Sequence, residues 1–387
     1  MPAFNRSAAV LSGCILAATL ALTLLAGCSS TSKTQAAGAV TALIHIELTN
    51  DGCKASPAQV PAGPAKFSVR NNGGSAVSEA ELVSGTKILG EKEGLTPGLT
   101  GTFSLDLAPG DYETYCPHAK TERSPFKVTG TASSARTAAT GAAAALASTG
   151  EQYRQYVQGK AETLIASTTV FVSAVKAGDV VKAKSLYAAA RAPYETIEPV
   201  AESFGDLDPD IDARDGDVPA AQWRGYHRIE KQLWVMGNTM GMAPVADQLL
   251  SDVNTLASKI KSTSFQPAEL ANGATELLNE VAKSKLTGEE ERYSRTDISD
   301  IDANVEGSQA AFDLLAPAMK ILDAGLTSQI QAKFSDLRTI MQKYSSGNGT
   351  YKPYTDLSDA HVKELSTAVN ALAEPLSRVA EQIVAIN

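Results

Sequence analysis

The chain has 387 residues, which is enough for two or three domains that each bury a sizeable core. Hydrophobic residues make up 43% of it, charged residues 20%, and the formal net charge is -9, a balance typical of a soluble acidic protein. The sequence contains no basic run or stripe, so its composition argues against a nucleic-acid-binding protein.

Residues 1–27 have the pattern of a signal peptide. Arg6 supplies a basic start, residues 8–25 are an apolar run, and residues 25–28 read LAGC. A cysteine directly after small residues resembles the lipobox of bacterial lipoproteins. We therefore expect a mature chain that begins with a lipidated Cys28 and a polar tether over residues 28–39. The alternative is an uncleaved membrane anchor, for which the apolar run is marginal, because a bilayer span needs about 20 residues.

Residues 40–130 are predicted to form a β-sandwich. Segments rich in β-branched residues with partial alternation, separated by Gly, Pro and Asn clusters, indicate short strands at 40–48, 65–70, 102–107, 111–116 and 125–128. Short strands at this spacing are typical of a sandwich. Residues 131–150, rich in Ala, Ser and Thr, are predicted to be a linker that is partly helical.

Residues 151–387 are predicted to form an all-α domain. Apolar residues take up a helical period there, and the joints between periodic runs carry Gly, Pro, Ser and Asn. Asp179 is predicted to cap the second helix. Helices are expected at 153–177, 179 to about 204, 225–234, 245–262, 267–284, 302–322, 327–344 and 359–386. This order predicts a bundle of helices.

One predicted helix carries candidate metal ligands. Within residues 225–234 (GYHRIEKQLW), His227 and Glu230 are three residues apart, so both point to the same face. An imidazole beside a carboxylate can hold a transition metal, or the two groups can simply hydrogen-bond to each other. The spacing alone leaves both interpretations open.

Three acidic segments accompany this helix: 194–199 (YETIEP), 206–217 (DLDPDIDARDGD) and 289–300 (EEERYSRTDISD). Acidic residues at the ends of helices are commonplace. For residues 289–300 the alternatives are a second metal patch, a docking face, or helix capping with Thr287 or Ser294 as the cap. We favour capping, because acids are favourable at helix starts.

The same motif argues against a zinc peptidase. Such enzymes place two histidines and a carboxylate together, as in H-E-x-x-H or H-x-x-E-H. Here Lys231 follows Glu230, and the remaining histidines, His45, His118 and His361, lie in other segments. We therefore expect a protein that is not an enzyme, with a residual metallopeptidase or redox role as the alternative.

The motif at 225–230 (GYHRIE) matches the G-x-H-x-x-E signature of the imelysin-like family. Further blocks that resemble this family are 176–191 (KAGDVVKAKSLYAAAR), 194–202 (YETIEPVAE), 206–214 (DLDPDIDAR) and 288–309 (GEEERYSRTDISDIDANVEGSQ). Nearly all of the mature chain resembles the members that serve in iron uptake. The resemblance implies a cupredoxin-like β-sandwich at 40–130 followed by an imelysin-like helical domain at 151–387.

The resemblance also implies acidic partners for the histidine. Carried over by motif, they are Glu195 and Asp212, with Glu198 as a substitute if the register is shifted. Together with His227 and Glu230 they offer one nitrogen and several carboxylate oxygens. Such a set suits Fe²⁺ or Fe³⁺ better than Cu(I), although Zn²⁺ and Mn²⁺ also fit.

A type 1 copper site is not expected in the β-sandwich. Such a site needs two histidines, a cysteine and usually an axial methionine. The sequence has no Met between residues 40 and 130, His118 lies too close to Cys116, and His45 falls in the middle of a strand. Blue-copper chemistry is therefore not predicted.

The resemblance instead implies a different metal site in the sandwich, formed by Cys53, Cys116, Glu79 and Glu81. Because Glu79 and Glu81 are two apart, a strand places both on one side. With the cysteines they are expected to bind Cu²⁺ or Fe³⁺. The alternative is a Cys53–Cys116 disulfide, which is usual for two thiols outside the cytoplasm. A reduced metal site and a disulfide exclude each other.

These expectations combine into one function. The resemblance implies a lipid-anchored iron-binding protein on the periplasmic side of the cell membrane, within an EfeUOB-type iron uptake system. Its partners would be an EfeU-like iron permease and an EfeB-like haem peroxidase. Two alternatives remain: a metallopeptidase, and a metal-dependent module that binds acidic polysaccharide, for which Arg224, Arg228 and Lys231 lie near the motif.

Overall fold

The computed structural model describes residues 41–131, 141–347 and 349–386. The predicted signal peptide, the predicted lipidation site Cys28, the tether and part of the predicted linker lie outside the described residues. None of the described helices combines the length and apolar character that a bilayer crossing requires.

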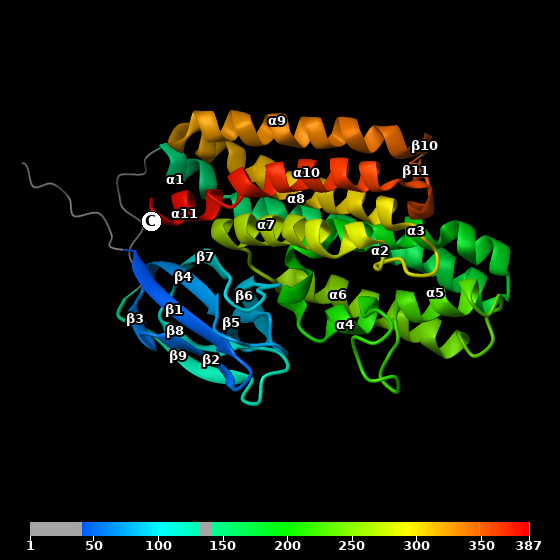
Figure 1. The fold of residues 1–387 in the computed structure, drawn as a ribbon, viewed down its shortest axis with the longest axis horizontal. Coiled ribbons are helices and arrows are strands. Elements are labelled where there is room, and N and C mark those ends of the chain that lie inside the picture. The colour runs from blue at the N-terminus through cyan, green and yellow to red at the C-terminus, as the bar shows by residue number, and fades with distance from the viewer. Residues whose placement is uncertain (1–40, 132–140, 348, 387) are drawn as a thin grey trace, which may run out of the picture. The chain divides into compact units, whose positions relative to one another are not determined.

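The N-terminal described region is the predicted β-sandwich, drawn blue to cyan in Figure 1. One sheet has the order β2-β1-β4-β7 and the other the order β3-β9-β8-β5-β6. β1 runs parallel to β4, while β4 and β7 are antiparallel. The strands are β1 Ala42–Thr49, β2 Gly52–Ser56, β3 Gln59–Pro61, β4 Gly63–Asn71, β5 Ala80–Ser84, β6 Lys87–Lys92, β7 Thr100–Leu107, β8 Gly110–Tyr115 and β9 Arg123–Thr129.

Alternation along the strands builds the core of the sandwich. In β1, Ile44, Ile46 and Leu48 are fully buried while the residues between them face solvent. The rings of Phe67 and Phe103 stack with centroids 4.6 Å apart. Apolar inner faces of this kind are what hold two sheets together.

The rest of the chain is helical, as predicted, and is drawn green to red in Figure 1. The α-helices are α1 Gly141–Leu146, α2 Thr149–Lys176, α3 Val180–Ile197, α4 Leu207–Asp212, α5 Tyr226–Trp234, α6 Ala243–Ser262, α7 Pro267–Lys283, α8 Asp297–Leu322, α9 Ala324–Met341, α10 Asp359–Leu376 and α11 Val379–Val384. The 3-10 helices are η1 Glu198–Phe204, η2 Lys285–Thr287, η3 Gln342–Tyr344 and η4 Tyr354–Asp356, and a small hairpin pairs β10 Ser345–Gly347 with β11 Thr350–Tyr351.

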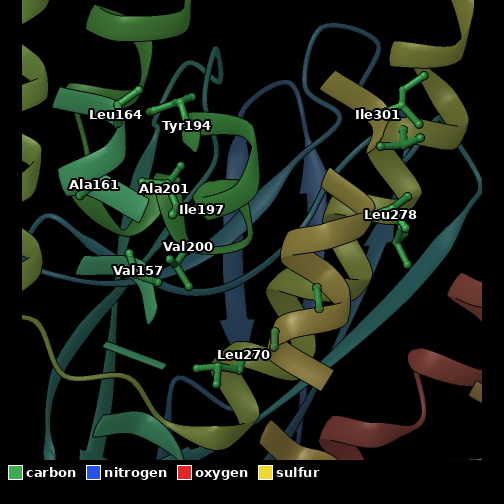
Figure 2. Packing of buried hydrophobic residues seen from close by; sticks show 14 of the residues in the cluster. Val157, Ala161, Leu164, Tyr194, Ile197, Val200, Ala201, Leu270, Leu278 and Ile301 are labelled. Carbon is green, nitrogen blue, oxygen red and sulfur yellow. The ribbon is translucent and has the colours of Figure 1, made fainter. Parts of the chain in front are cut away.

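Buried apolar side chains from separate helices pack together in the helical region. Figure 2 shows residues of α2, α3 and η1 on one side and residues of α7 and α8 on the other. α3 packs against α2 and α8, and α8 packs against α7. Because α3, η1 and α8 all supply acidic residues to the candidate site, this packing positions that site.

Three predicted helix boundaries were wrong for identifiable reasons. The second helix ends at Ile197 and continues as the 3-10 helix η1, because Pro199 has no N–H to continue the α-helical ladder. α8 begins at Asp297, five residues earlier than predicted, and so includes the end of the acidic 289–300 segment. The last predicted helix divides into α10 and α11, with Pro375 near the break.

The predicted cap of the second helix is confirmed. The carboxylate of Asp179 accepts a hydrogen bond of 3.0 Å from the backbone N–H of Lys182.

Candidate metal site

His227 and Glu230 lie side by side on α5, as their spacing predicted. Both side chains are buried, and Nδ1 of His227 is 3.3 Å from Oε2 of Glu230. The other oxygen of Glu230, Oε1, accepts hydrogen bonds from the backbone N–H groups of Tyr293 (2.9 Å) and Ser294 (2.6 Å). These bonds fix the carboxylate of Glu230, which in turn orients the imidazole ring.

The other ring nitrogen of His227 faces two different carboxylates. Nε2 lies 3.6 Å from Oδ1 of Asp212 and 3.7 Å from Oε1 of Glu290. This buried nitrogen has no hydrogen-bond partner. One ligand atom from each of the three residues lies within 4.8 Å of the others, a spacing at which a single cation can be held.

A second grouping of the same kind lies on the Nδ1 side, where His227, Glu230 and Glu291 come together. Its oxygens already have partners. Glu291 accepts hydrogen bonds from Tyr187 and Ser294, and Glu230 accepts those from the backbone described above. Oxygens on the Nε2 side have partners too, since Asp212 pairs with Arg191 and Glu290 with Arg214. Asp212 and Glu290 line a cavity, however, whereas Glu230 and Glu291 do not. The Nε2 side is therefore the better candidate cation site, with Glu230 as the group that orients the ring.

Gly225 explains how Asp212 reaches His227. Its φ is +84°, and a Cβ at this position would lie 2.2 Å from the carbonyl oxygen of Ile211. Only glycine allows the backbone before α5 to approach the end of α4 so closely. The glycine of the G-x-H-x-x-E motif thus brings the α4 carboxylate to the imidazole.

Beside the imidazole lies a group of buried charges, which we call the charge cluster. Its permanent cations are Arg191 and Lys285, both without exposed surface. Its carboxyl groups are Glu195, Glu198, Asp212, Glu230, Glu290, Glu291 and Asp300. Arg214 adds a partly exposed cation at the rim, with NH1 3.1 Å from Oε2 of Glu290.

Arg191 is the centre of the charge cluster. Its guanidinium group meets five carboxylates, those of Glu195, Asp212, Glu290, Glu291 and Asp300. Its planar fork also lies 5.7 Å from the centre of the Tyr226 ring. A guanidinium group held on so many sides is a fixed part of the structure.

Lys285 pairs with Glu195 and Glu198, two carboxylates that the family resemblance implied as metal ligands. Its Nζ is 3.0 Å from Oε2 of Glu195 and 2.6 and 2.8 Å from the two oxygens of Glu198. The amide of Asn304 donates to the same two carboxylates. Of the four predicted ligands, the structure therefore brings Asp212, His227 and Glu230 into contact, and connects Glu195 through Arg191 and Lys285.

The capping interpretation of residues 289–300 holds only in part, because Asp297 and Asp300 do lie in the first turn of α8 but neither Thr287 nor Ser294 is its cap. Glu290, Glu291, Asp297 and Asp300 are buried. Three of them, Glu290, Glu291 and Asp300, belong to the charge cluster around Arg191. Thr296 precedes α8 without a side-chain capping bond. The strength of the family resemblance over 288–309 was the signal that marked this segment.

A cavity of about 470 Å³ reaches the two carboxylates nearest Nε2, although His227 itself does not line it. Asp212 and Glu290 line it, together with Glu198 and Glu280, and Glu79 and Glu81 of the sandwich line it as well. Glu230 and Glu291 are not among the lining residues. A cation in the cavity can therefore reach Asp212 and Glu290, but not Glu230 or Glu291.

Comparison with known proteins agrees with this architecture. The family model described as imelysin matches residues 150–379, and the one described as a cupredoxin-like domain matches residues 16–124. The iron uptake system component EfeO of Escherichia coli O157:H7 is 37% identical over 340 residues, 87% of this chain and 90% of that protein. The chain belongs to the EfeO family. The EfeO proteins of Escherichia coli K12 and Shigella flexneri match with the same identity and coverage.

In this EfeO-family chain, protons compensate for the excess of acid in the charge cluster. Burial raises the pKa of Glu291 to about 8 and that of Asp300 well above its usual range. Burial also disfavours the charge on Glu195, but Lys285 and Arg191 outweigh it and lower the pKa of that carboxyl to about 2. The cluster thus contains both ionised and protonated acids at neutral pH.

His227 is also protonated in the metal-free chain. Burial and Arg191 oppose its charge, but the neighbouring carboxylates of Glu230, Glu290 and Asp212 outweigh them and raise its pKa to about 10. A metal ion bound at Nε2 would replace the proton there, and Nδ1–H would then donate to Glu230. Cation binding and proton release are coupled at this ring.

The cupredoxin-like sandwich contains a disulfide. Cys53 and Cys116 are joined, with Cα atoms 6.2 Å apart, so their sulfurs are not available as metal ligands. Of the two alternatives for these cysteines, the structure has the disulfide. Glu79 and Glu81 both line the cavity, and burial raises the pKa of Glu81 to about 7. Glu79 also groups with Glu91 and Glu93 at a spacing compatible with a cation.

The remaining histidines of this EfeO-family chain lie away from α5. His45 lies in β1, His118 follows β8, and His361 lies in the first turn of α10 beside the ring of Tyr344. His118 lines the same cavity as Asp212 and Glu290, but among the described residues no second histidine lies within ligand distance of them.

Proposed function

We propose that this chain is an extracytoplasmic iron-binding protein that captures iron at Asp212, His227 and Glu290 and passes it to a membrane permease. Its relatives of 37% identity are named as components of an iron uptake system. In this proposal these three residues form a carrier site, and iron is the cargo that they bind and release.

The buried nitrogen of His227 carries the proposal. Nε2 lacks a hydrogen-bond partner, and the nearest acidic atoms are carboxylate oxygens of Asp212 and Glu290. A buried polar atom without a partner is costly, and a bound cation removes that cost. One nitrogen with hard carboxylate oxygens favours Fe²⁺ or Fe³⁺, and Zn²⁺ and Cu²⁺ are the competitors to be tested.

The composition of the charge cluster supports a reversible carrier. Seven carboxyl groups share two buried permanent cations and the rim residue Arg214. An incoming cation replaces protons held by this excess of acid, so its binding strength follows pH. A carrier needs such a balance, because it must bind iron and then release it.

The binding of acidic polysaccharide receives less support from the structure. Arg224 pairs with Asp210 and Asp252, and Lys231 pairs with Asp215. Their charges are thus engaged by the chain's own acids. The cavity beside the site is lined by many more acidic than basic residues, which repels a polyanion.

The membrane attachment and the partners complete the proposal. Lipidation at Cys28 would hold the chain on the periplasmic side of the cell membrane. An EfeU-like permease would receive the iron, and an EfeB-like haem peroxidase would be the second partner. Labelling with a clickable fatty acid tests the anchor: wild type should be labelled and Cys28→Ser should not.

Titration calorimetry tests the iron site. The purified mature chain is titrated with Fe²⁺ under anaerobic conditions and with chelated Fe³⁺, in parallel with His227→Ala. His361→Ala is the matched control, because His361 lies on α10 outside the charge cluster. We expect His227→Ala to abolish binding and His361→Ala to leave it unchanged. Equal binding by wild type and His227→Ala would remove this site from the proposal.

A further inference from the structure

Lys285 is the one member of the charge cluster whose position suits movement. Its ammonium group contacts Glu195 and Glu198 only through Nζ, at the end of a flexible four-carbon stem. Arg191, in contrast, is held by five carboxylates around a planar fork. If one buried cation gives up its partners, it is therefore Lys285.

The ammonium group lies close to the proposed cation site. Its Nζ is 3.9 Å from Oε1 of Glu290, and the same oxygen is 3.7 Å from Nε2 of His227. A cation bound to Glu290 would stand within a few ångströms of Nζ. Two positive charges so close in a buried environment repel each other strongly, because little water lies between them to screen the interaction.

A further acid lies near the ammonium group. Glu280, on α7, lies within electrostatic range of Lys285 and lines the cavity. Lys285 itself is in the short 3-10 helix η2, which directly follows α7 and ends at Gly288 with φ +77°. An exchange of Glu195 and Glu198 for Glu280 would keep the ammonium group in acidic surroundings.

We propose that Lys285 is an internal competitor for the cargo cation. In the metal-free chain its ammonium group holds Glu195 and Glu198; a cation that enters between Asp212, His227 and Glu290 drives it toward Glu280. The released carboxylates then face the cation. The inference rests on the proposed function, since it concerns the same site, and it assigns to Lys285 the task of keeping iron binding weak enough for release.

The competition makes two variants change affinity in opposite directions. Lys285→Met removes the competitor at similar side-chain length, so Kd should fall at least tenfold, with slower release to a chelator. Glu280→Gln removes the alternative partner, so Kd should rise at least threefold. A lysine with a merely structural role would give weaker binding in Lys285→Met and no change in Glu280→Gln.

The experiment measures Kd and release rate on the full mature chain by competition with a chromogenic chelator. Mn²⁺ is the redox-inert probe and Fe²⁺ is used anaerobically. Lys283→Met and Glu276→Gln are the matched controls, because Lys283 contacts the carbonyl of Glu93 and Glu276 pairs with Lys92. Both should keep the wild-type Kd.

Each outcome is decisive. A folded Lys285→Met with an unchanged or higher Kd overturns the proposal, as does a Glu280→Gln that binds as wild type. If Lys285→Met does not fold, Glu280→Gln alone decides. Failure of the proposed function would give a different result. Wild type would then show no binding of Mn²⁺ or Fe²⁺ that depends on His227.

Discussion

Nε2 of His227 lies 3.6 Å from Oδ1 of Asp212, although the two residues come from different helices. The close approach of Gly225 to Ile211 brings them together. Glu230, the carboxylate of the sequence motif, is on the opposite side of the ring at Nδ1. The two acids therefore have different tasks, one toward the cation and one toward the ring.

This difference predicts that replacing each acid by its uncharged amide weakens Fe²⁺ binding to different extents. Asp212→Asn and Glu290→Gln each remove a carboxylate on the Nε2 side, so each should weaken Fe²⁺ binding by more than about 100-fold. Glu230→Gln keeps one oxygen, which can accept either from Nδ1–H or from the backbone N–H groups of Tyr293 and Ser294 but not from both. Its loss should be nearer about 10-fold, as for groups that orient a ligand. Calorimetry measures the difference.

Asp210→Asn is the control for this series, since Asp210 lies on α4 but pairs with Arg224. NMR of the ¹⁵N-labelled chain loaded with Zn²⁺ identifies the coordinating nitrogen, which should be Nε2 of His227. Coordination through Nδ1, with Glu230→Gln as the most damaging change, would reverse the assignment.

Gly225→Ala should break the connection between α4 and α5. The new Cβ would lie 2.2 Å from the carbonyl oxygen of Ile211, and the φ of +84° is unfavourable for alanine. We expect a loss of about 2 kcal/mol or more in unfolding free energy and a loss of iron binding, because Asp212 and His227 move apart. Urea unfolding and calorimetry measure the two effects.

Gly159→Ala is the contrasting substitution. Gly159 is exposed in the middle of α2, and nothing lies within 4 Å of a Cβ placed there. Alanine should stabilise this helix by up to about 1 kcal/mol and leave iron binding unchanged. A Gly225→Ala variant that is as stable as Gly159→Ala and binds iron as well would show that the close approach of Gly225 to Ile211 is unimportant.

The sequence allowed the two folds and half of the site to be predicted. Periodicity places His227 and Glu230 on one face whatever surrounds them, and they do lie together. Glu290 and Lys285 could not be predicted in this way. They reach the site only because the α7–α8 connection packs against α3 and η1, and local pattern does not encode such long-range packing.

The same limit explains why the capping interpretation of residues 289–300 holds only in part. In a sequence, acids before a helix look like caps, because capping is a local effect. Whether Glu291 and Asp300 face solvent or Arg191 depends on how α8 packs on α3. Arg191 itself, inside a helical pattern, showed no sign that five carboxylates would surround it.

Removal of the disulfide should destabilise the sandwich without weakening the helical site. Cys53 and Cys116 are 63 residues apart, and closing a loop of that length stabilises by about 4 kcal/mol in the chain-entropy account. The double variant Cys53→Ala/Cys116→Ala should unfold at lower urea concentration. Its Fe²⁺ affinity at His227 should equal that of wild type, which calorimetry checks.

Thiol titration of the denatured wild type is the companion measurement. If the disulfide is present, the mature chain without Cys28 should show no free thiol before reduction and two after it, since Cys14 lies in the predicted signal peptide. Two free thiols in the purified chain, together with copper or iron bound to the sandwich, would support the metal alternative for these cysteines.

Asp208 should make the metal-free chain less stable as the pH rises. Burial raises its pKa from about 3.8 to about 6, although Tyr194 donates a hydrogen bond to it. Between these values the folded chain keeps a proton that the unfolded chain has lost. Its contribution to stability therefore falls as pH rises from about 4 to about 6, and stays reduced above that.

Asp208→Asn imitates the protonated acid at every pH, and its carbonyl can still accept the hydrogen bond from Tyr194. The variant should match wild type near pH 4 and exceed it by about 3 kcal/mol at pH 8, following the rule of about 1.4 kcal/mol per pKa unit. Urea unfolding in chelator-containing buffer at both pH values measures this. Asp206→Asn, on the preceding turn, is the control. Its difference in unfolding free energy from wild type should not increase between pH 4 and pH 8. A constant difference between Asp208→Asn and wild type across this range would mean that the carboxyl of Asp208 is ionised throughout.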